Sequence, residues 1–392
     1  MGVRNEVKEL EQYIVSLRRY FHQHPEASLK EYETAKKIEE ELDLLGIEHH
    51  RVGETGVVGY IRGKEGKTLA LRADIDALEI KELNDVSYAS INEGLMHACG
   101  HDAHTASLLG AAKVLKEKEK DLNGTVKLFF QQAEEIGQGA RQFVAEGLLK
   151  DVDSAFGLHV SSRLDTGKIT VTPGPISASC DYFKATVIGK SGHVSSPHTA
   201  VDALYIASLG VVNLQGIVAR QNNPVDPVVV GIGVLNSGTR YNIIAKEAIL
   251  EGTFRTFSLE TRKKTQDSIE RILRNTCEAN GAELEIEFRS YSSPLINDEE
   301  SAGFAAEIAK IIVGVEHVNT QQPKSLGADD FAELALEVPG VYVNIGTRSK
   351  ENDRSAYPHH HEKFDIDEEG LLTSTEFYVL YTLNYLNGNG EL

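Results

Sequence analysis

The stretch TLALRADIDALEI, Thr68 to Ile80, joins a strand pattern to a pair of carboxylates. Residues 68–73 form a short apolar run, which is typical of a buried strand. Asp74 and Asp76 follow on one face, because side chains two positions apart in an extended chain point the same way. Carboxylates at a strand end are suited to orienting a metal-bound histidine, and aspartates in an ordinary turn are the alternative.

On both sides of this stretch, strand and helix patterns alternate. We expect helices at residues 6–22 and 102–115, an extended segment at 57–61 and strands at 68–73, 125–131 and 154–160. Helices at 301–312 and 368–386 and a strand at 340–345 follow later in the chain. Strands separated by helices are typical of an α/β fold with a mixed, mostly parallel sheet that has helices on both faces.

The pattern changes after TPGPISAS, Thr172 to Ser179, a run of small residues and proline that marks a domain boundary. After it we expect a strand that begins at residue 181, a helix at 200–218, strands at 228–235 and 245–256, a helix at 259–279 and a strand at 283–289. This order predicts an α+β, ferredoxin-like unit with one antiparallel sheet and two helices on one face. We therefore expect a discontinuous domain of residues 1–180 and 293–392, with residues 181–292 inserted.

Composition narrows the possible partners. The 392 residues include 59 acidic and 40 basic side chains, giving a net charge of −19 without a dense Lys or Arg stripe. Nucleic acid is therefore not an expected partner. We identify no membrane span and no signal peptide in the sequence. The cysteines Cys99, Cys180 and Cys277 are odd in number and far apart, which favours a reducing cytoplasm over a disulfide framework.

The segment MHACGHDAHT, Met96 to Thr105, carries candidate metal ligands. In an extended backbone Cys99 and His101 point to the same side, and thiolate and imidazole both bind zinc and related metals. Asp102 is suited to cap the helix that follows. The alternative is a buried structural cysteine beside a His-Asp pair that caps the helix.

The segment FFQQAEEIGQGA, Phe129 to Ala140, ends an apolar strand in two adjacent carboxylates. Glu134 and Glu135 can serve one site only where the strand gives way to its loop, and they lie at that point. One would bind metal and the other would act as general base toward water. An exposed acidic helix start is the alternative.

Isolated histidines complete the candidate set. His159 closes the predicted strand SAFGLHV, and His359, His360 and His361 form a cluster before KFDIDEEG. A single histidine is more often structural than a metal ligand. The cysteine and the paired glutamates of the same chain favour a ligand role for these histidines. Cys99, His101, Glu135, His159 and one histidine of the cluster would suffice for two cations that share a ligand or a water.

The sequence resembles the amidohydrolase branch of the aminoacylase and carboxypeptidase metallopeptidases, which includes N-acetyl-amino-acid deacetylases, hippurate hydrolases and auxin-conjugate hydrolases. The matching segments include RRYFHQHPEASLKEYETA (Arg18 to Ala35), LRADIDAL, MHACGHDAHT, FFQQAEE, GLHV, GKSGHVSSPH (Gly189 to His198), RYNIIAKEAILEGTFRTF (Arg240 to Phe257), GADDFAEL (Gly327 to Leu334) and HHHEKFDIDEE. They keep a consistent order over nearly the whole chain.

The resemblance implies a role for each site residue. The metal ligands would be Cys99, His101, Glu135, His159 and His360, the last chosen because the family ligand stands four residues before a phenylalanine, here Phe364, with His359 and His361 also possible. Glu134 would be the base and Asp76 the orienting aspartate. His193 would steady the oxyanion, and Asn242 and Arg255 would bind polar groups of the substrate.

The resemblance further implies two divalent ions (zinc, manganese, cobalt or nickel), an N-acyl amino acid as substrate and a homodimer or higher homo-oligomer formed through the inserted lid. Glu79 and Gln132 replace usual prolines and Ala27 a usual leucine, which affects the expected pocket shape. A dipeptidase or carboxypeptidase of the same family is the closest alternative. A thiol hydrolase with Cys99 as nucleophile and a non-catalytic metal-binding protein are the others.

Overall fold

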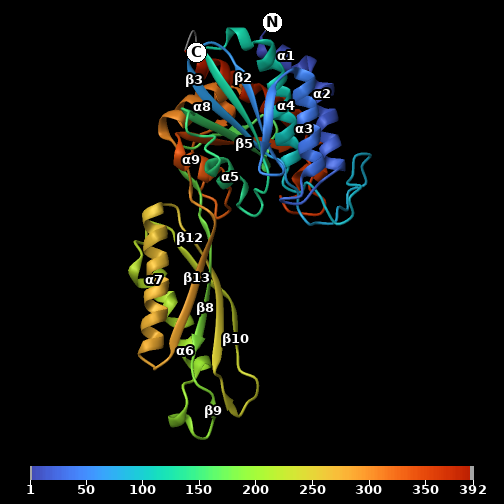
Figure 1. The fold of residues 1–392 in the computed structure, drawn as a ribbon. Helices are drawn as coiled ribbons and strands as arrows, with labels where there is room; N and C mark the ends of the chain where they lie inside the picture. Colours follow the sequence, from blue (N-terminus) through green and yellow to red (C-terminus); the bar gives the residue numbers. More distant parts are fainter. Residues whose placement is uncertain (1, 389–392) are drawn as a thin grey trace. The chain divides into compact units, whose positions relative to one another are not determined.

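The computed structural model describes residues 2–388, which divide into two compact units (Figure 1). Unit 1 comprises the chain up to Gly174, Ile296–Pro323 and the chain from Asp329 onward. Unit 2 comprises Pro175–Leu295 and Lys324–Ala328. The short segment Lys324–Ala328 thus groups with unit 2, although its neighbours on both sides belong to unit 1.

Unit 1 is built on an eight-stranded mixed sheet, whose order is β1-β2-β4-β3-β5-β16-β6-β15. The strands are β1 (Glu48–Val52), β2 (Gly56–Arg62), β4 (Gly124–Gln131), β3 (Lys67–Asp74), β5 (Ser154–Asp165), β16 (Gly340–Arg348), β6 (Ile169–Thr170) and β15 (Val318–Asn319). The central strands β4, β3, β5 and β16 are parallel, whereas β1, β2 and the β16–β6 pair are antiparallel. The predicted mixed, mostly parallel sheet is confirmed.

The helices of unit 1 cover this sheet (Figure 1). They are α1 (Val3–Glu9), α2 (Glu11–Gln23), α3 (Tyr32–Leu45), α4 (His101–Glu117), α5 (Gly139–Ala145), α8 (Glu299–Val313), α9 (Phe331–Glu337) and α10 (Glu369–Asn387). Helix α4 packs against α2, α10 and β3 and is buried over most of its length. Gly110 permits the close approach of α2, because a Cβ there would lie 2.8 Å from Ile14 Cγ1.

Unit 2 is an antiparallel sheet with two helices packed on it. The strands are ordered β10 (Val229–Ser237), β12 (Glu247–Arg255), β8 (Cys180–Ile188) and β13 (Glu283–Ser292). Burial alternates along β8 and β12, as expected for a sheet with one covered face. Phe183, Ala185 and Val187 pack with residues of α6 (Ala203–Gly216) and α7 (Leu259–Glu278).

Helix α6 begins three residues later than the pattern predicts. Asp202 accepts hydrogen bonds from the amides of Leu204 and Tyr205, so it caps the helix and sets its start. Ala203–Gln221 is the one stretch among residues 2–388 that is long and apolar enough for a membrane span by length and composition. About a third of this stretch is buried, including Ala203, Ile206, Ala207 and Leu214 in the unit 2 core.

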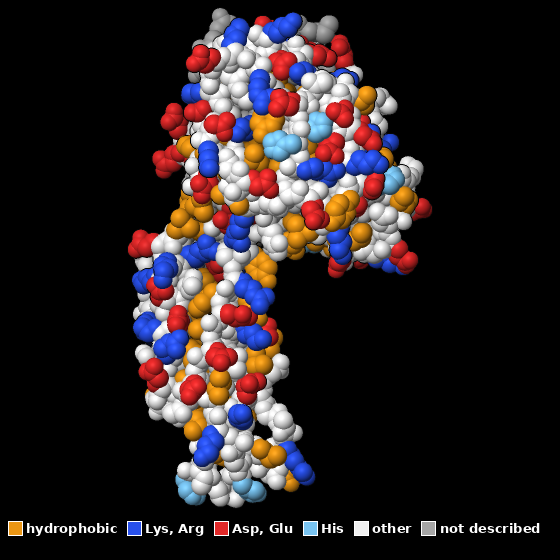
Figure 2. Space-filling view, viewed as in Figure 1, with side chains coloured by type: hydrophobic (Ala, Val, Ile, Leu, Met, Phe, Trp, Pro, Cys, Tyr) orange, Lys and Arg blue, Asp and Glu red, His pale blue; other side chains and the backbone are white. Residues whose placement is uncertain are grey.

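The visible surface carries charges of both signs. Figure 2 shows Lys and Arg side chains interspersed with Asp and Glu side chains over the face in view. The ionisable residues that determine the candidate site are mostly inside unit 1 rather than on this surface.

Candidate metal centre

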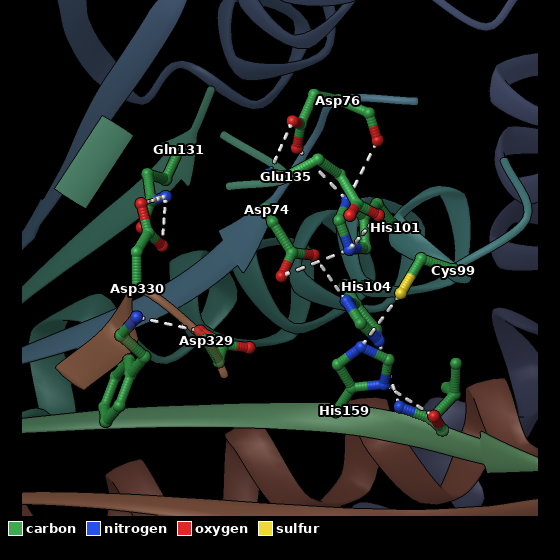
Figure 3. Close-up of polar contacts among 12 residues, drawn as sticks. Asp74, Asp76, Cys99, His101, His104, Gln131, Glu135, His159, Asp329 and Asp330 are labelled. Atoms are coloured by element: carbon green, nitrogen blue, oxygen red, sulfur yellow. Dashed lines mark hydrogen bonds and ion pairs between the residues drawn. The ribbon is translucent and has the colours of Figure 1, made fainter. Parts of the chain in front are cut away.

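Parallel strands bring the candidate residues to one edge of the unit 1 sheet. Strands β4, β3 and β5 are neighbours, so their carboxyl ends lie side by side. Asp74 ends β3, Glu134 and Glu135 follow β4, and His159 lies on β5 beyond its last pairing with β3 at Gly157. Figure 3 shows the labelled members of this group around a common centre, together with Cys99 and His101.

The strand that carries His159 is longer than predicted. We expected His159 to close its strand, whereas β5 continues to Asp165. The reason is its partner β16, which pairs with β5 as far as Arg348 opposite Asp165, while β3 stops at Asp74. His159 is therefore positioned by an uninterrupted strand and still lies near the end of β3.

The start of α4 also differs from the prediction. Gly100, at φ +91°, is the N-cap, and Asp102 lies within the first turn. Asp102 instead accepts hydrogen bonds from Arg18 Nε (2.9 Å) and His22 Nδ1 (2.7 Å), all three side chains being buried. A side chain at position 100 would meet Val160 Cγ2 at 2.4 Å, so glycine is required by space as well as by φ.

His101 is held by a carboxylate on one nitrogen and faces other carboxylates with the second. Its Nδ1 lies 2.9 Å from the Asp76 carbonyl oxygen and 3.2 Å from Asp76 Oδ1. Its Nε2 lies 3.7 Å from Asp74 Oδ2 and 3.9 Å from Glu135 Oε1. Among the described residues, neither His101 Nε2 nor Glu135 Oε1 has a hydrogen-bond partner, although both are buried.

Cys99 belongs to two groups of possible ligand atoms. In each group the ligand atoms lie within 4.8 Å of one another: Cys99, His101 and Glu135 form one, and Cys99, His159 and His359 form the other. Cys99 Sγ lies 3.5 Å from His159 Nε2. A thiol, imidazoles and a carboxylate with free buried atoms suit zinc and related cations, and a shared cysteine suits a pair of them. The donor set therefore fits a dinuclear metal centre.

Two histidines of the terminal cluster reach the site from the same loop. His359 Nδ1 lies 3.2 Å from the Cys99 carbonyl oxygen, and its ring centroid is 5.0 Å from that of His159. His360 has φ +65° and its Nε2 lies 3.6 Å from Glu135 Oε1, with 53% of its side chain exposed. His359 thus approaches the Cys99–His159 group, and His360 approaches Glu135. His361 instead stacks on Tyr357, at a ring-centroid distance of 4.5 Å.

Burial and neighbouring charges control ionisation at the site. Burial raises the pKa of Glu135 to about 7, and Asp76 adds to the rise. Burial raises the pKa of Glu134 well above its ordinary value, and Asp329 raises it further. Burial raises the pKa of the Cys99 thiol and lowers the pKa of His159 and, to about 3, of His359. The protein alone therefore favours neutral forms of these groups, and bound cations would favour the ligand forms.

Glu134 lies beside a buried charge network to which we assigned no role from the sequence, although Asp329 and Asp330 stand in the matching segment GADDFAEL. One carboxylate oxygen each of Glu134, Asp329 and Asp330 lies within 4.8 Å of the others. Asp330 accepts hydrogen bonds from Arg72 Nη2 (2.8 Å), Gln131 Nε2 (2.8 Å) and the Ala140 amide (3.0 Å). Asp330 thereby binds both ends of the loop that carries Glu134, and Figure 3 shows it beside Gln131.

His104 was also missed, although it stands in the motif that contains Cys99 and His101. It lies one helical turn after His101, its Nδ1 is 2.5 Å from Asp74 Oδ1, and its Nε2 accepts the Val160 amide at 2.9 Å. The three-residue spacing from His101 was the available sequence signal, because residues three apart share a helix face. His104 links β3 to the strand segment that carries His159.

The other three predicted residues belong to unit 2. His193 is exposed on β9 (Gly192–His193), which pairs with β11 (Ile243–Ile244), and its Nδ1 lies 2.7 Å from Ser195 Oγ. The Asn242 carbonyl accepts the Val194 amide at 3.2 Å, and Asn242 Oδ1 is buried without a partner in the described part of the chain. Arg255 ends β12 and its Nη1 donates to the Leu326 carbonyl at 3.4 Å. The structure thus brings His193 and Asn242 together and places Arg255 on another strand.

Comparison with known proteins identifies the class to which this fold and site belong. A profile of Peptidase family M20/M25/M40 matches residues 70–384. The chain is 41% identical over 392 residues to Thermostable carboxypeptidase 2 of Saccharolobus solfataricus, covering 98% of each chain. It is 37% identical to N-acetylcysteine deacetylase of Bacillus subtilis, covering 93% of this chain and 95% of that one. A crystal structure of Bacillus subtilis YXEP, described as a dinuclear metal-binding M20 peptidase, matches with a TM-score of 0.84 and 34% identity over 97% of this chain and all of that one.

The chain belongs to peptidase family M20/M25/M40. It is a metal-dependent hydrolase that acts on amide bonds. The resemblance inferred from its motifs is thereby confirmed, and a hydrolase of this family accounts for the paired glutamates and the histidines better than a thiol hydrolase does.

Proposed function

We propose that this enzyme hydrolyses the amide bond of N-acyl amino acids, such as acetyl or benzoyl derivatives, and releases a carboxylic acid and a free amino acid. The observation that carries the proposal is the meeting of Cys99, His101, Glu135 and His159 at one sheet edge, with Glu134 next in sequence to Glu135 (Figure 3). The similarity to a deacetylase of N-acetylcysteine supports this substrate class.

In this proposal, Cys99, His101, Glu135, His159 and His360 hold two divalent cations, which are zinc, manganese, cobalt or nickel. Such cations supply Lewis acidity, which lowers the pKa of water and polarises a carbonyl group. Asp76 holds His101 through Nδ1, so that Nε2 faces the other ligands. This arrangement fixes both the tautomer and the direction of the imidazole.

Glu134 is the proposed general base. It takes a proton from the attacking water and then gives that proton to the leaving nitrogen of the amide. His193 would steady the charge that develops on the carbonyl oxygen, and its Nε2 is the ring nitrogen not used toward Ser195. Arg255 would pair with the substrate carboxylate and Asn242 with a polar group of the substrate.

The competing activity is removal of a C-terminal amino acid from a peptide, which the similarity to a carboxypeptidase favours. Full-length protein reconstituted separately with zinc, manganese, cobalt or nickel should be given matched N-acetyl and N-benzoyl amino acids, dipeptides and blocked dipeptides. We expect the highest kcat/KM on an N-acyl amino acid. Faster cleavage of the peptides would replace the proposal with a peptidase, and loss of all turnover after chelation would confirm the need for metal in either case.

We also propose that the enzyme forms a homodimer through unit 2 in a reducing cytoplasm. Helix α6 exposes Tyr205 at 55% and Val212 at 68%, and β10 is an edge strand of its sheet. Exposed apolar side chains next to an unpaired edge favour a partner of the same kind. The three cysteines are free thiols, in keeping with a reducing compartment.

Light scattering on the purified protein tests the dimer. The Val212→Glu variant should shift the mass toward a single chain, because it places a charge in an apolar contact. Ile311→Glu, which changes a similarly exposed residue of unit 1, should not. A wild-type mass of one chain at micromolar concentration would rule the dimer out.

A further inference from the structure

The segment between α2 and α3, residues 24–31, contacts the candidate centre, although the proposed function gives it no role. It belongs to the stretch RRYFHQHPEASLKEYETA, which carries part of the family resemblance but contains none of the predicted site residues. Three contacts tie it to the strand ends. The Glu26 carbonyl accepts the Ala77 amide (2.8 Å), Ser28 Oγ donates to Asp76 Oδ2 (2.7 Å), and Glu31 Oε1 accepts the Ala133 amide (2.9 Å).

Ala133 is the strained element of the loop that presents the two glutamates. It has φ +53°, a left-handed conformation that a residue with a Cβ rarely adopts. It directly precedes Glu134, and its carbonyl accepts the amides of Gln138 (3.1 Å) and Gly139 (3.4 Å). Strained backbone of this kind persists only where surrounding contacts enforce it, and it gathers at functional sites.

Glu31 supplies the contact that enforces this conformation from outside the loop. It is fully buried, and so is Ala133, so the hydrogen bond between Glu31 Oε1 and the Ala133 amide is shielded from water. A buried amide that loses its acceptor is costly, which makes the turn at Ala133 dependent on Glu31. The Asp76 oxygen that Ser28 contacts also accepts the Glu135 amide at 3.1 Å, so the segment supports the glutamate pair at two points.

We propose that Glu31 is a positioning residue of the hydrolase: its carboxylate holds Ala133 in the left-handed conformation that aims Glu134 and Glu135 at the centre. The inference rests on the proposed function in one respect, since it takes Glu134 as the base and Glu135 as a ligand. This role acts through the Ala133 amide and requires no contact between Glu31 and the substrate. Ser28 has a lesser part, because it reaches the pair only through Asp76.

The test compares Glu31→Ala with Glu31→Gln. The alanine variant removes the acceptor, and we expect kcat to fall about 100-fold with a small change in KM, as for a misplaced catalytic group. The glutamine variant keeps an acceptor oxygen without the charge, and we expect a loss of less than about tenfold. Glu41→Ala is the matched control, because Glu41 is also a buried carboxylate of unit 1 but bonds Tyr13 and Lys37 instead of the loop.

A spectroscopic measurement separates positioning from general stability and from the proposed activity. The visible absorption spectrum of Co²⁺-loaded protein responds to ligand geometry and needs no substrate. We expect a changed spectrum for Glu31→Ala and an unchanged one for Glu31→Gln and Glu41→Ala. The melting temperature of each variant is measured separately, as a control for overall stability. If wild type hydrolyses none of the tested amides, the proposed function fails, and the spectra still decide the role of Glu31.

A second substitution tests the strain directly. Glycine tolerates φ +53° without the Cβ penalty, so adding Ala133→Gly to Glu31→Ala should restore part of the lost kcat and of the Co²⁺ spectrum. The proposal is overturned if Glu31→Ala changes kcat and spectrum no more than Glu41→Ala does. It is also overturned if Glu31→Gln is as damaged as Glu31→Ala, or if Ala133→Gly restores nothing.

Discussion

The two units differ most in what they bury. Unit 1 encloses many ionisable side chains, among them Arg18, Arg72, Asp74, His101 and Asp330. Among the described residues of unit 2, Asp181 is the one buried charged side chain, and it is paired with Arg262. Burying charge is costly unless partners compensate for it, and in unit 1 Arg18 is paired with Asp102 and Arg72 with Asp330. Unit 2 has a largely apolar core.

The strongest test of this difference between the two units removes one cysteine thiol from each unit. Cys99→Ala should lose bound metal and about 10⁴-fold or more of the activity, because Cys99 belongs to both ligand groups. Cys180→Ala, in unit 2, should keep both. Metal analysis and hydrolysis assays on the two purified variants provide the measurement. A fully metallated, active Cys99→Ala protein would remove the cysteine from the ligand set.

The Glu134→Gln variant tests whether unit 1 supplies a general base in addition to metal ligands. The amide cannot accept the water proton, so we expect kcat to fall about 10³-fold, while metal content stays at the wild-type level because Cys99, His101 and Glu135 are intact. Glu333→Gln, a carboxylate of the neighbouring helix α9, serves as the control for charge loss in this unit. Near-normal turnover by the metallated Glu134→Gln variant would contradict the role assigned to Glu134.

The contrast also shows which features could be predicted from the sequence. Strands β3, β4 and β5 were predictable because their apolar runs are continuous, and Cys99 and His101 because they lie two residues apart in one motif. Pairing between distant residues was not predictable. The ion pair between Arg72 and Asp330 depends on how the strands and α9 meet in space, and no local sequence pattern encodes that contact.

Helix α3 was overlooked for a different reason. Its sequence, YETAKKIEEELDLL, is rich in charge, and the buried Ile38 and Leu42 form a narrow stripe at four-residue spacing. This four-residue spacing of apolar side chains is visible in the sequence and would have indicated the helix. The Asp102 prediction failed because a good capping residue is also a good partner for a buried arginine, and Arg18 comes from another helix.

Buried charge in unit 1 should make its stability depend on pH. Burial and Arg18 oppose protonation of His22, but Asp102 and Glu82 outweigh them and raise the pKa of His22 to about 9. Because this folded-state pKa lies above the unfolded value near 6.5, the stabilisation is complete below pH 6.5 and is lost as pH rises through 9. It amounts to roughly 3 kcal/mol.

Denaturant titrations at fixed metal concentration measure this effect. Between pH 6 and pH 10, wild type should lose roughly 3 kcal/mol more unfolding free energy than His22→Gln does. His198→Gln changes an exposed histidine of unit 2 and should follow wild type. Parallel curves for wild type and His22→Gln would mean that folding does not raise the pKa of His22.

The smallest expected effect concerns Arg255, the residue of unit 2 that we propose to bind the substrate carboxylate. Arg255→Gln removes the guanidinium that we propose to pair with the substrate carboxylate, so KM for an N-acyl amino acid should rise about tenfold with kcat and metal content unchanged. Arg289→Gln is the control, because Arg289 is an exposed arginine of the same sheet that pairs with Glu287. An N-acyl amino acid amide lacks the carboxylate, and its KM should be the same for wild type and Arg255→Gln. If KM for the acid does not change, unit 2 does not use Arg255 to recognise the substrate carboxylate, and the contribution of this unit would have to rest on His193 and Asn242.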